Sequence, residues 1–421
     1  TRARLRWAGA GLVLLMLGGL VWQAVVASRA PQSQVDGVEF EPEALAHPDK
    51  VEMLARMNEA QLAQQGVSAM TAALRAPSPQ ALAADETEVC GLGRVKADGT
   101  GRPHDMAPIR DATQRLREQI VPTLVASPDD TTRAAGLLIV ALGDQVAADG
   151  PEGRATRARD ELASLAAFTG SPQVYAWALH ACQKQRGDGV CRMLSAEQWA
   201  RLEPSNAMAW LQVAADARVR RDEAAVAEAM YRVSQAPRSD ARQGTLVGTV
   251  LAKMPPEADL LARIGLAQEL ARLEARAELP LVAASQHCGA SEVRDANRQQ
   301  VCAAVADVLS RRGSTRAEAA LAASIGERAG WAAERVAAAG EERDALAEMS
   351  GAALAPNAWS CTALAQALAH FHESARHGEL ATLRNALKRS PDGAGVLARR
   401  YREAQATRVA SAASAASTVS P

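Results

Sequence analysis

Apolar residues recur at intervals of three and four along most of this chain, and this spacing limits the folds open to it. Such intervals place apolar side chains on one face of an α-helix. Clear examples are Ile109-Ala112-Leu116-Ile120 and Leu260-Ile264-Ala267-Leu270-Leu273. The pattern extends from about residue 51 to 403, and Gly or Pro interrupts it roughly every fifteen to twenty residues. The sequence therefore predicts an all-α domain over 51–403, built from stacked helix hairpins.

Signals for β-strands are scarce. Aromatic residues make up only 3% of the chain, and no long alternation of β-branched residues and no Asn-Gly turn is present. Because 48% of the residues are hydrophobic, most of the chain is able to bury a core. The glycine-containing stretch 90–108 is expected to be a surface loop. The Ala-, Ser- and Thr-rich tail, residues 404–421, is expected to be disordered.

The stretch from Ala8 to Ala27 is apolar except for Gln23. About 20 helical residues cross the ~30 Å hydrocarbon layer of a bilayer. Three arginines precede the stretch and one follows it closely, which directs residues 1–7 toward the cytoplasm. Residues 28–50 carry three prolines and several acids and are expected to be a linker. The sequence thus predicts a single transmembrane helix in a bacterial inner membrane, in contact with the lipid bilayer through residues 8–27, with the bulk of the chain in the periplasm.

An alternative interpretation makes the same stretch a cleaved signal peptide. Val25 and Ala27 have the small-residue spacing that signal peptidase accepts, and Ser28 follows them. The rest of the chain would then be a soluble periplasmic protein. Both interpretations export residues 51–403.

The six cysteines agree with export, because their number is even and no CxxC motif is present. Ranked by loop length, the expected disulfides are Cys182–Cys191 and Cys288–Cys302, each joining two neighbouring helices. Cys90 and Cys361 remain for a long-range bridge or as two free thiols. The alternative is six buried, reduced thiols.

Several function classes lack their sequence signatures. With 47 basic and 48 acidic residues the net charge is −1, which argues against a nucleic-acid partner. The chain has no Gly-Lys pair of a P-loop, no GxSxG elbow and no SxxK motif. The sequence therefore predicts no cofactor and identifies no catalytic residues.

The best metal candidates are His370, His372, Glu373 and His377. A zincin helix requires two histidines four residues apart. His372 and His377 are five apart, about 140° around a helix, while His370 and His377 share a face but lie about two turns apart. We therefore expect a polar helix face and no metal site. These residues remain the first suspects if the chain is an envelope enzyme of unidentified chemistry.

Residues 202–214 carry the most specific motif of the chain. A proline is followed by polar residues, a tryptophan and an apolar-small pair, at Pro204, Trp210, Val213 and Ala214. This order resembles the junction between two tetratricopeptide repeats, in which a proline closes one helix pair and the tryptophan opens the next. Asp222 lies where that family has an acidic turn residue. The sequence departs from the family at Arg221, Val226 and Val233.

The resemblance is clearest over residues 172–237 and implies helix pairs at 172–203 and 204–237. Trp177 precedes Trp210 by 33 positions, and a weaker pair at 356–391 contains Trp359 and a Gly378-Glu379 turn. The alternative is an irregular α-helical domain whose Ala-rich hairpins look alike. Stacked pairs of this kind present a concave surface, so the resemblance implies a non-catalytic scaffold for a protein or peptide of the cell envelope. The candidates for repeat packing or for the groove are Trp177, Trp210 and Asp222.

Overall fold

The computed structural model describes residues 83, 85–98, 101–143, 151–183, 188–276, 280–351 and 359–417. The predicted membrane segment 8–27 and linker 28–50 lie outside these residues. None of the helices in the described ranges is both long and apolar enough to cross a bilayer.

The described chain is predominantly helical, which confirms the all-α prediction. Its elements are β1 (Glu86–Val89), β2 (Gly93–Lys96), α3 (Ala107–Val125), α4 (Asp130–Leu142), α5 (Pro151–Phe168), α6 (Pro172–Ala181), the 3-10 helix η4 (Gly189–Met193), α7 (Ala196–Leu202), α8 (Ala207–Val219), α9 (Glu223–Gln235), α10 (Thr245–Leu251), α11 (Leu260–Ala275), α12 (Leu281–His287), the 3-10 helix η5 (Glu292–Arg294), α13 (Ala296–Arg312), α14 (Arg316–Arg328), α15 (Ala333–Gly351), α16 (Cys361–His377), α17 (Glu379–Arg389) and α18 (Ala394–Ser417).

Polar N-cap residues start many of these helices. Asp129 begins α4 by accepting the backbone N–H of Thr132 at 2.8 Å. Thr315 and Glu318 form a capping box at the start of α14, in which each side chain accepts the backbone N–H of the other. Since the first backbone N–H groups of a helix have no partner within it, these caps determine where the helices begin.

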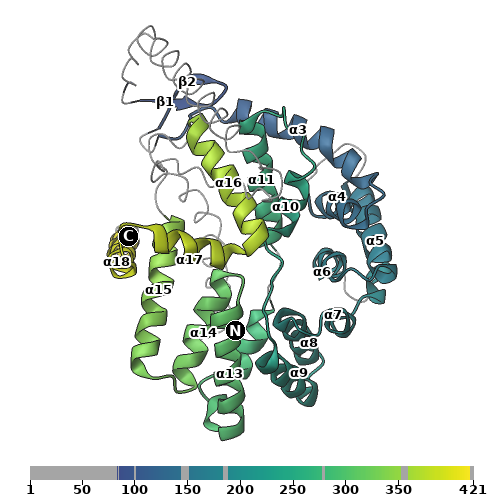
Figure 1. Ribbon diagram of the computed structural model, residues 1–421, viewed down its shortest axis with the longest axis vertical. Coiled ribbons are helices and arrows are strands. Elements are labelled where there is room, and N and C mark those ends of the chain that lie inside the picture. Colours follow the sequence, from purple (N-terminus) through teal and green to yellow (C-terminus); the bar gives the residue numbers. More distant parts are fainter. Residues whose placement is uncertain are drawn as a thin grey trace, which may run out of the picture.

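Helices α3 to α9 follow a curve, and α13 to α15 continue the array beyond α9 (Figure 1). Helices α10, α11 and α16 form a second layer, in which α10 and α11 pack against α4 and α3. One hydrophobic core extends from Val89 at the end of β1 to Phe371 on α16. The fold therefore combines a curved array with helices that pack across it.

One short segment crosses the inside of this array. Residues 236–244, the crossing segment, run from the end of α9 to the start of α10 (Figure 1). On one side, the Ala207 N–H donates to the Arg238 carbonyl oxygen at 2.9 Å. On the other side, the Ser239 N–H donates to the Arg312 carbonyl oxygen at 3.1 Å. The crossing segment thus joins α8 to the end of α13.

The prediction of a surface loop at 90–108 is wrong, because this stretch contains β2 and the start of α3. Strand β2 pairs with β1 in antiparallel register, with Glu86 opposite Lys96 and Val89 opposite Gly93. Gly91 and Gly93 have φ values of 78° and 74°, which a tight turn requires and which glycine adopts without strain. Val89 is buried and fixes the hairpin to the core.

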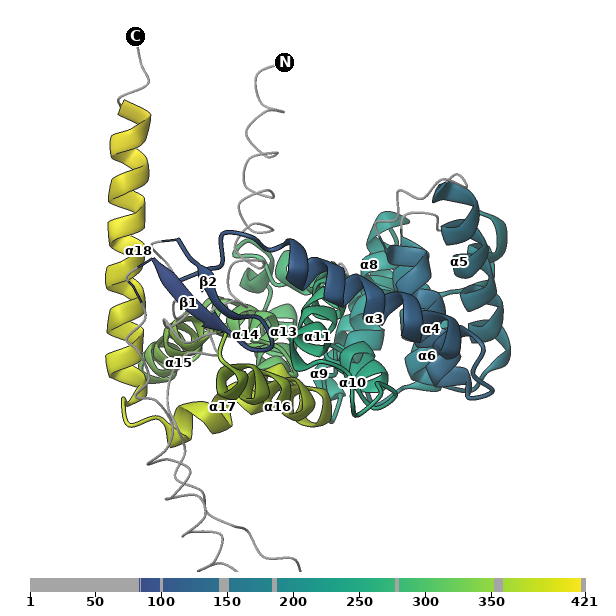
Figure 2. The ribbon, with the colours of Figure 1, turned by 90° about the horizontal axis from the view of Figure 1, so that it is seen from above.

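The prediction of a disordered C-terminal tail is also wrong for most of its length. Helix α18 continues to Ser417, so residues 404–417 of the expected disordered tail are helical. Alanine has the highest helix propensity of all residues, which explains why an Ala-rich end extends the helix. Figure 2 shows α18 standing along one side of the molecule and extending beyond the body; its first turns pack against α15 through Leu397 and Ala398.

Both expected short-range disulfides are present, and Cys90 and Cys361, for which a bridge or two free thiols were both possible, also form a disulfide. Cys182–Cys191 joins the end of α6 to η4, and Cys288–Cys302 joins the end of α12 to α13. Cys90–Cys361 closes a sequence separation of 271 residues between the β-hairpin and α16. The described part of the chain contains no free cysteine.

Each proposed repeat unit contains a pair of helices. Residues 204–237 hold α8 and α9, and residues 356–391 hold α16 and α17, with Gly378 at φ 84° between them. The unit 172–203 holds α6 and α7 but is interrupted by η4 and its disulfide.

Candidate functional site: a recess on the inner side of the array

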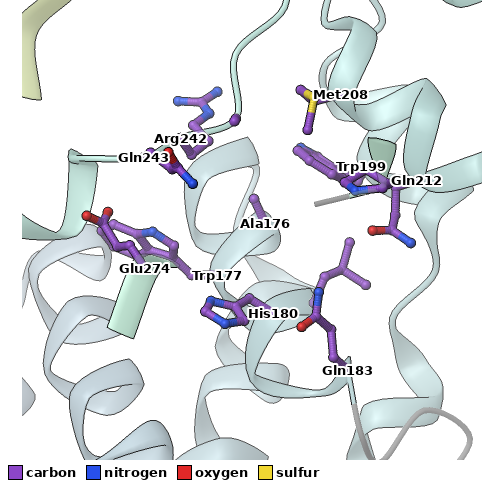
Figure 3. Close-up of a pocket in the computed structure, with 13 residues that line it drawn as sticks. Ala176, Trp177, His180, Gln183, Trp199, Met208, Gln212, Arg242, Gln243 and Glu274 are labelled. Atoms are coloured by element: carbon purple, nitrogen blue, oxygen red, sulfur yellow. The ribbon is translucent and has the colours of Figure 1, made fainter. Parts of the chain in front are cut away.

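A recess lies between α6, α7, α8 and the crossing segment, with a volume of about 70 Å³ (Figure 3). Helix α11 and Pro280 complete its wall. The lining residues are Ala176, Trp177, Leu179, His180, Gln183, Trp199, Met208, Gln212, Ala241, Arg242, Gln243, Glu274 and Pro280. Three stretches far apart in the sequence, around residues 180, 242 and 274, therefore form one site.

Helix α6 supplies one wall of the recess. Ser171 caps this helix by accepting the Val174 N–H, and Pro172 occupies its first turn. Trp177 and His180 are three residues apart, which places them on one face of the helix. Trp177 is only 4% exposed, so its indole serves as a wall of the recess and has little surface left for stacking.

The opposite wall is anchored by a buried carboxylate, Glu203. The Trp199 indole N–H donates to Glu203 Oε2 at 3.0 Å. Arg238 and Arg242 each form a short ion pair with Glu203 Oε1. Burial acts to raise the pKa of Glu203, but Arg242, a hydrogen bond from Asn206 and Arg238 together lower it. The carboxylate therefore stays charged and, together with Asp240, which lies 3.5 and 3.6 Å from Arg238 and Arg242, balances the charge of the two guanidiniums.

Glu274, in the wall that α11 contributes, accepts hydrogen bonds from the backbone at the start of α10. Its two carboxyl oxygens accept the N–H groups of Gly244 at 2.9 Å and Leu246 at 2.7 Å. Burial raises the pKa of Glu274 to about 8, although these backbone donors act against the rise. At neutral pH this carboxyl is mostly protonated and carries little charge.

His180 is the third titratable residue of the lining. Burial lowers the pKa of His180 to about 4, so its imidazole is neutral at physiological pH. With Arg242 paired to Glu203 and Glu274 mostly protonated, the recess presents almost no net charge. What it presents is indole, thioether and amide surface, from Trp177, Met208 and Gln243 among others (Figure 3).

Of the three residues predicted for repeat packing or for the groove, only Trp177 lines the recess. The Trp210 indole N–H donates to the Pro204 carbonyl oxygen at 2.9 Å, and the Arg232 guanidinium lies 5.8 Å from the centre of its ring. Asp222 caps α9 by accepting the Ala225 N–H at 3.0 Å. Trp210 therefore connects α8 to α9, Asp222 caps α9, and neither residue lines the recess.

The histidines that form the best metal candidate all lie on α16. The His370 imidazole is within 3.5 Å of the Ser374 hydroxyl on the next turn, and burial lowers the pKa of His370. His377 is exposed at the end of the helix. Over the described ranges, no group of three or more His, Cys, Asp or Glu side chains is arranged to hold a metal ion.

Sequence analysis did not single out Arg242, Gln243 or Glu274. These residues follow α9 or lie on α11, and neither region matches the repeat motif. One signal was available for α6, because Trp177 and His180 share a helix face. No comparable pattern marks the crossing segment, whose role depends on partners more than thirty residues away.

Comparison with models of known protein families, with curated proteins and with solved structures found no match to this chain.

Proposed function

We propose that this protein is a non-catalytic scaffold that binds a segment of another protein in the recess between α6, α8 and the crossing segment. The observation that carries this proposal is the chemistry of the recess: an almost uncharged, largely apolar site on the inner side of a curved helical array. A wall of indole, thioether and amide groups suits an uncharged side chain together with the peptide groups beside it.

The size of the recess favours a peptide side chain over a small-molecule substrate. Its volume is about 70 Å³, whereas ligand pockets usually span roughly 300–1,000 Å³. A dry cavity of about 150 Å³ is known to hold benzene. The recess is about half that size, so we assign it to one aliphatic side chain, such as that of Leu, Ile or Val, with the rest of the partner lying outside it.

The proposal includes the compartment and the family resemblance. The three disulfides support an oxidising compartment, in agreement with a chain anchored in the bacterial inner membrane through residues 8–27 and facing the periplasm. The partner would then be a protein or peptide of the cell envelope. The helix pairs at 172–203 and 204–237 support a divergent tetratricopeptide-like arrangement. The alternative is an envelope enzyme that uses His370 and His377, and within the described residues these histidines belong to no group able to hold a metal ion.

Site-directed photo-crosslinking tests this proposal in cells. A photo-reactive amino acid at Gln243, on the rim of the recess, should capture a defined partner. The same amino acid at Glu228, an exposed position on α9, serves as the matched control. A second variant, Ala176→Trp, places a large ring inside the recess and should reduce the crosslink.

The proposal fails if positions 243 and 228 capture the same proteins. It also fails if Ala176→Trp folds normally, as judged by its circular dichroism spectrum, and leaves the crosslink at 243 unchanged.

A further inference from the structure

The three disulfides differ sharply in exposure. The four cysteines of Cys182–Cys191 and Cys288–Cys302 are buried, with exposed fractions of 0 to 3%. In contrast, Cys361 is exposed and Cys90 is half-buried. A thiolate must reach a disulfide sulfur to open it, so accessibility separates Cys90–Cys361 from the other two.

Helix α16 adds a chemical reason for reactivity. Cys361 is its first residue, and Ser360 caps the helix by accepting the Ala363 N–H at 3.2 Å. The partial positive charge at a helix start stabilises a thiolate there, which makes Cys361 a good leaving group. Neither buried disulfide has a cysteine at the first position of an α-helix.

The bond also joins two parts of the fold that lie far apart in the sequence, the β-hairpin and α16. The two strands form an isolated sheet, and such a hairpin is marginally stable alone. Besides the disulfide, the Cys90 N–H donates to the Trp359 carbonyl oxygen at 2.8 Å, and Val89 packs into the core. Opening the bond would leave the hairpin attached through hydrogen bonds and apolar packing alone.

We propose that Cys90–Cys361 is a site of thiol–disulfide exchange with an external dithiol, which opens this bond while the two buried disulfides stay closed. In this role the bond controls how firmly the hairpin is held against the start of α16.

The exchange proceeds in two balanced steps. A thiolate of the dithiol attacks Sγ of the exposed residue Cys361, forming a mixed disulfide, and Cys90 leaves as a thiolate that takes a proton from water. The second thiolate of the dithiol then attacks its partner sulfur in the mixed disulfide, and Cys361 leaves as a thiolate. Two electrons pass to the protein, and the dithiol becomes a disulfide.

Alkylation under native conditions tests the proposal on the intact oxidised chain. The protein is treated with dithiothreitol without denaturant, free thiols are trapped with iodoacetamide, and each cysteine is followed by mass spectrometry. We expect Cys90 and Cys361 to be trapped at least roughly tenfold faster than the other four, because access limits the attack. Trapping of either buried pair at the same rate or faster would overturn the proposal.

Hydrogen exchange gives a second readout on the same sample. Amides of residues 86–97 should exchange faster after reduction, whereas those of α13 should not change. The variant Cys90→Ser/Cys361→Ser should lose the fast alkylation phase, while Cys288→Ser/Cys302→Ser should keep it. If reduction opens the bond but leaves exchange at 86–97 unchanged, the proposed control of the hairpin is wrong.

Discussion

At the scale of single residues, Arg221 occupies a backbone conformation that suits glycine. Its φ is 60°, in the left-handed region, and it lies between the end of α8 and the cap residue Asp222. The tetratricopeptide resemblance places a turn glycine here, so the sequence departure coincides with local backbone strain. Left-handed backbone costs a non-glycine residue about 1–2 kcal/mol.

We expect Arg221→Gly to stabilise the protein by about 0.5 kcal/mol, because relief of this strain exceeds the added flexibility of the unfolded chain. Arg220 is the matched control. It has an ordinary helical φ of −79°, so Arg220→Gly should destabilise by about 0.5–1 kcal/mol. Denaturant unfolding of both variants measures the difference; equal effects would contradict this explanation.

His180 gives the stability a pH dependence. The pKa of His180 is lowered by burial from 6.5 to about 4. As pH falls through 6.5, the unfolded chain takes up a proton that the folded chain takes up only near pH 4. The free energy of unfolding should therefore fall between these values, by up to about 1.4 kcal/mol per pH unit for this residue.

Glu274 acts in the opposite direction, because burial raises its pKa from 4.5 to about 8. Its contribution to stability is present below pH 4.5 and is lost as pH rises toward 8. The variant His180→Gln isolates the histidine: its stability should decline less than that of the wild type as pH is lowered from 6.5. Urea unfolding across this range checks the prediction, and parallel curves for the two proteins would contradict it.

At the scale of elements, glycine permits one close approach between a helix and the residue that follows it. A Cβ at Gly326 on α14 would lie 2.2 to 2.5 Å from ring atoms of Trp331. The Arg335 guanidinium covers the same ring, 3.5 Å from its centre. The indole therefore has little room to move.

Gly326→Ala should destabilise the protein by about 1–3 kcal/mol, the usual cost of overpacking. Gly340 in α15 is the control, since a Cβ there would meet no atom within 4 Å. Gly340→Ala should stabilise by up to about 1 kcal/mol through helix propensity. Thermal unfolding of both variants measures the difference. If both variants are stabilised, the close contact at Trp331 is wrong.

The helices and two of the disulfides were predictable from sequence, and the hairpin was not. Apolar spacing marks helices of several turns, and short separations predicted two of the disulfides, whereas Cys90 and Cys361 could have been a bridge or two free thiols. Strands β1 and β2 are only four residues long. Their charged residues, Glu86, Glu88, Arg94 and Lys96, leave too few apolar positions to show that Thr87 and Val89 are buried. In the tail, low complexity was interpreted as disorder although alanine itself favours the helix.

At the scale of the whole molecule, three buried glutamate side chains from different helical regions hold the crossing segment. Glu203 pairs with Arg238 and Arg242, Glu318 accepts the Ser239 hydroxyl, and Glu274 accepts the Gly244 N–H. The Glu203 side chain is 2% exposed, and removal of one member of a buried ion pair leaves its partners uncompensated.

We expect Glu203→Gln to destabilise the protein by about 2–3 kcal/mol, less than for fully buried pairs because Arg238 is partly exposed. The exposed pair of Glu197 and Arg220, 3.1 Å apart, is the control. Glu197→Gln should change stability by less than about 0.5 kcal/mol. Urea unfolding, followed by tryptophan fluorescence, compares the two variants, and equal losses of stability would contradict the role of Glu203.

The recess itself was only partly predictable, because it is formed by residues that lie far apart in the sequence. The residues that build it interact across the chain: Arg238 lies 35 positions from Glu203, and Ser239 lies 79 positions from Glu318. Helical periodicity reports neighbours three or four positions apart and contains no information about such pairs. Trp177 was found because it belongs to a local motif, whereas Arg242 and Glu274 belong to none.

The crossing segment also determines how this protein may be divided. A fragment that ended at residue 235 would leave Glu203 without both arginines, and one that began at residue 245 would leave Glu318 without Ser239. Helices before and after the segment complete the same interior, so neither fragment has a finished surface. Unlike an array whose end units can be removed one at a time, this chain cannot be divided at either edge of residues 236–244 without separating a buried glutamate from a partner.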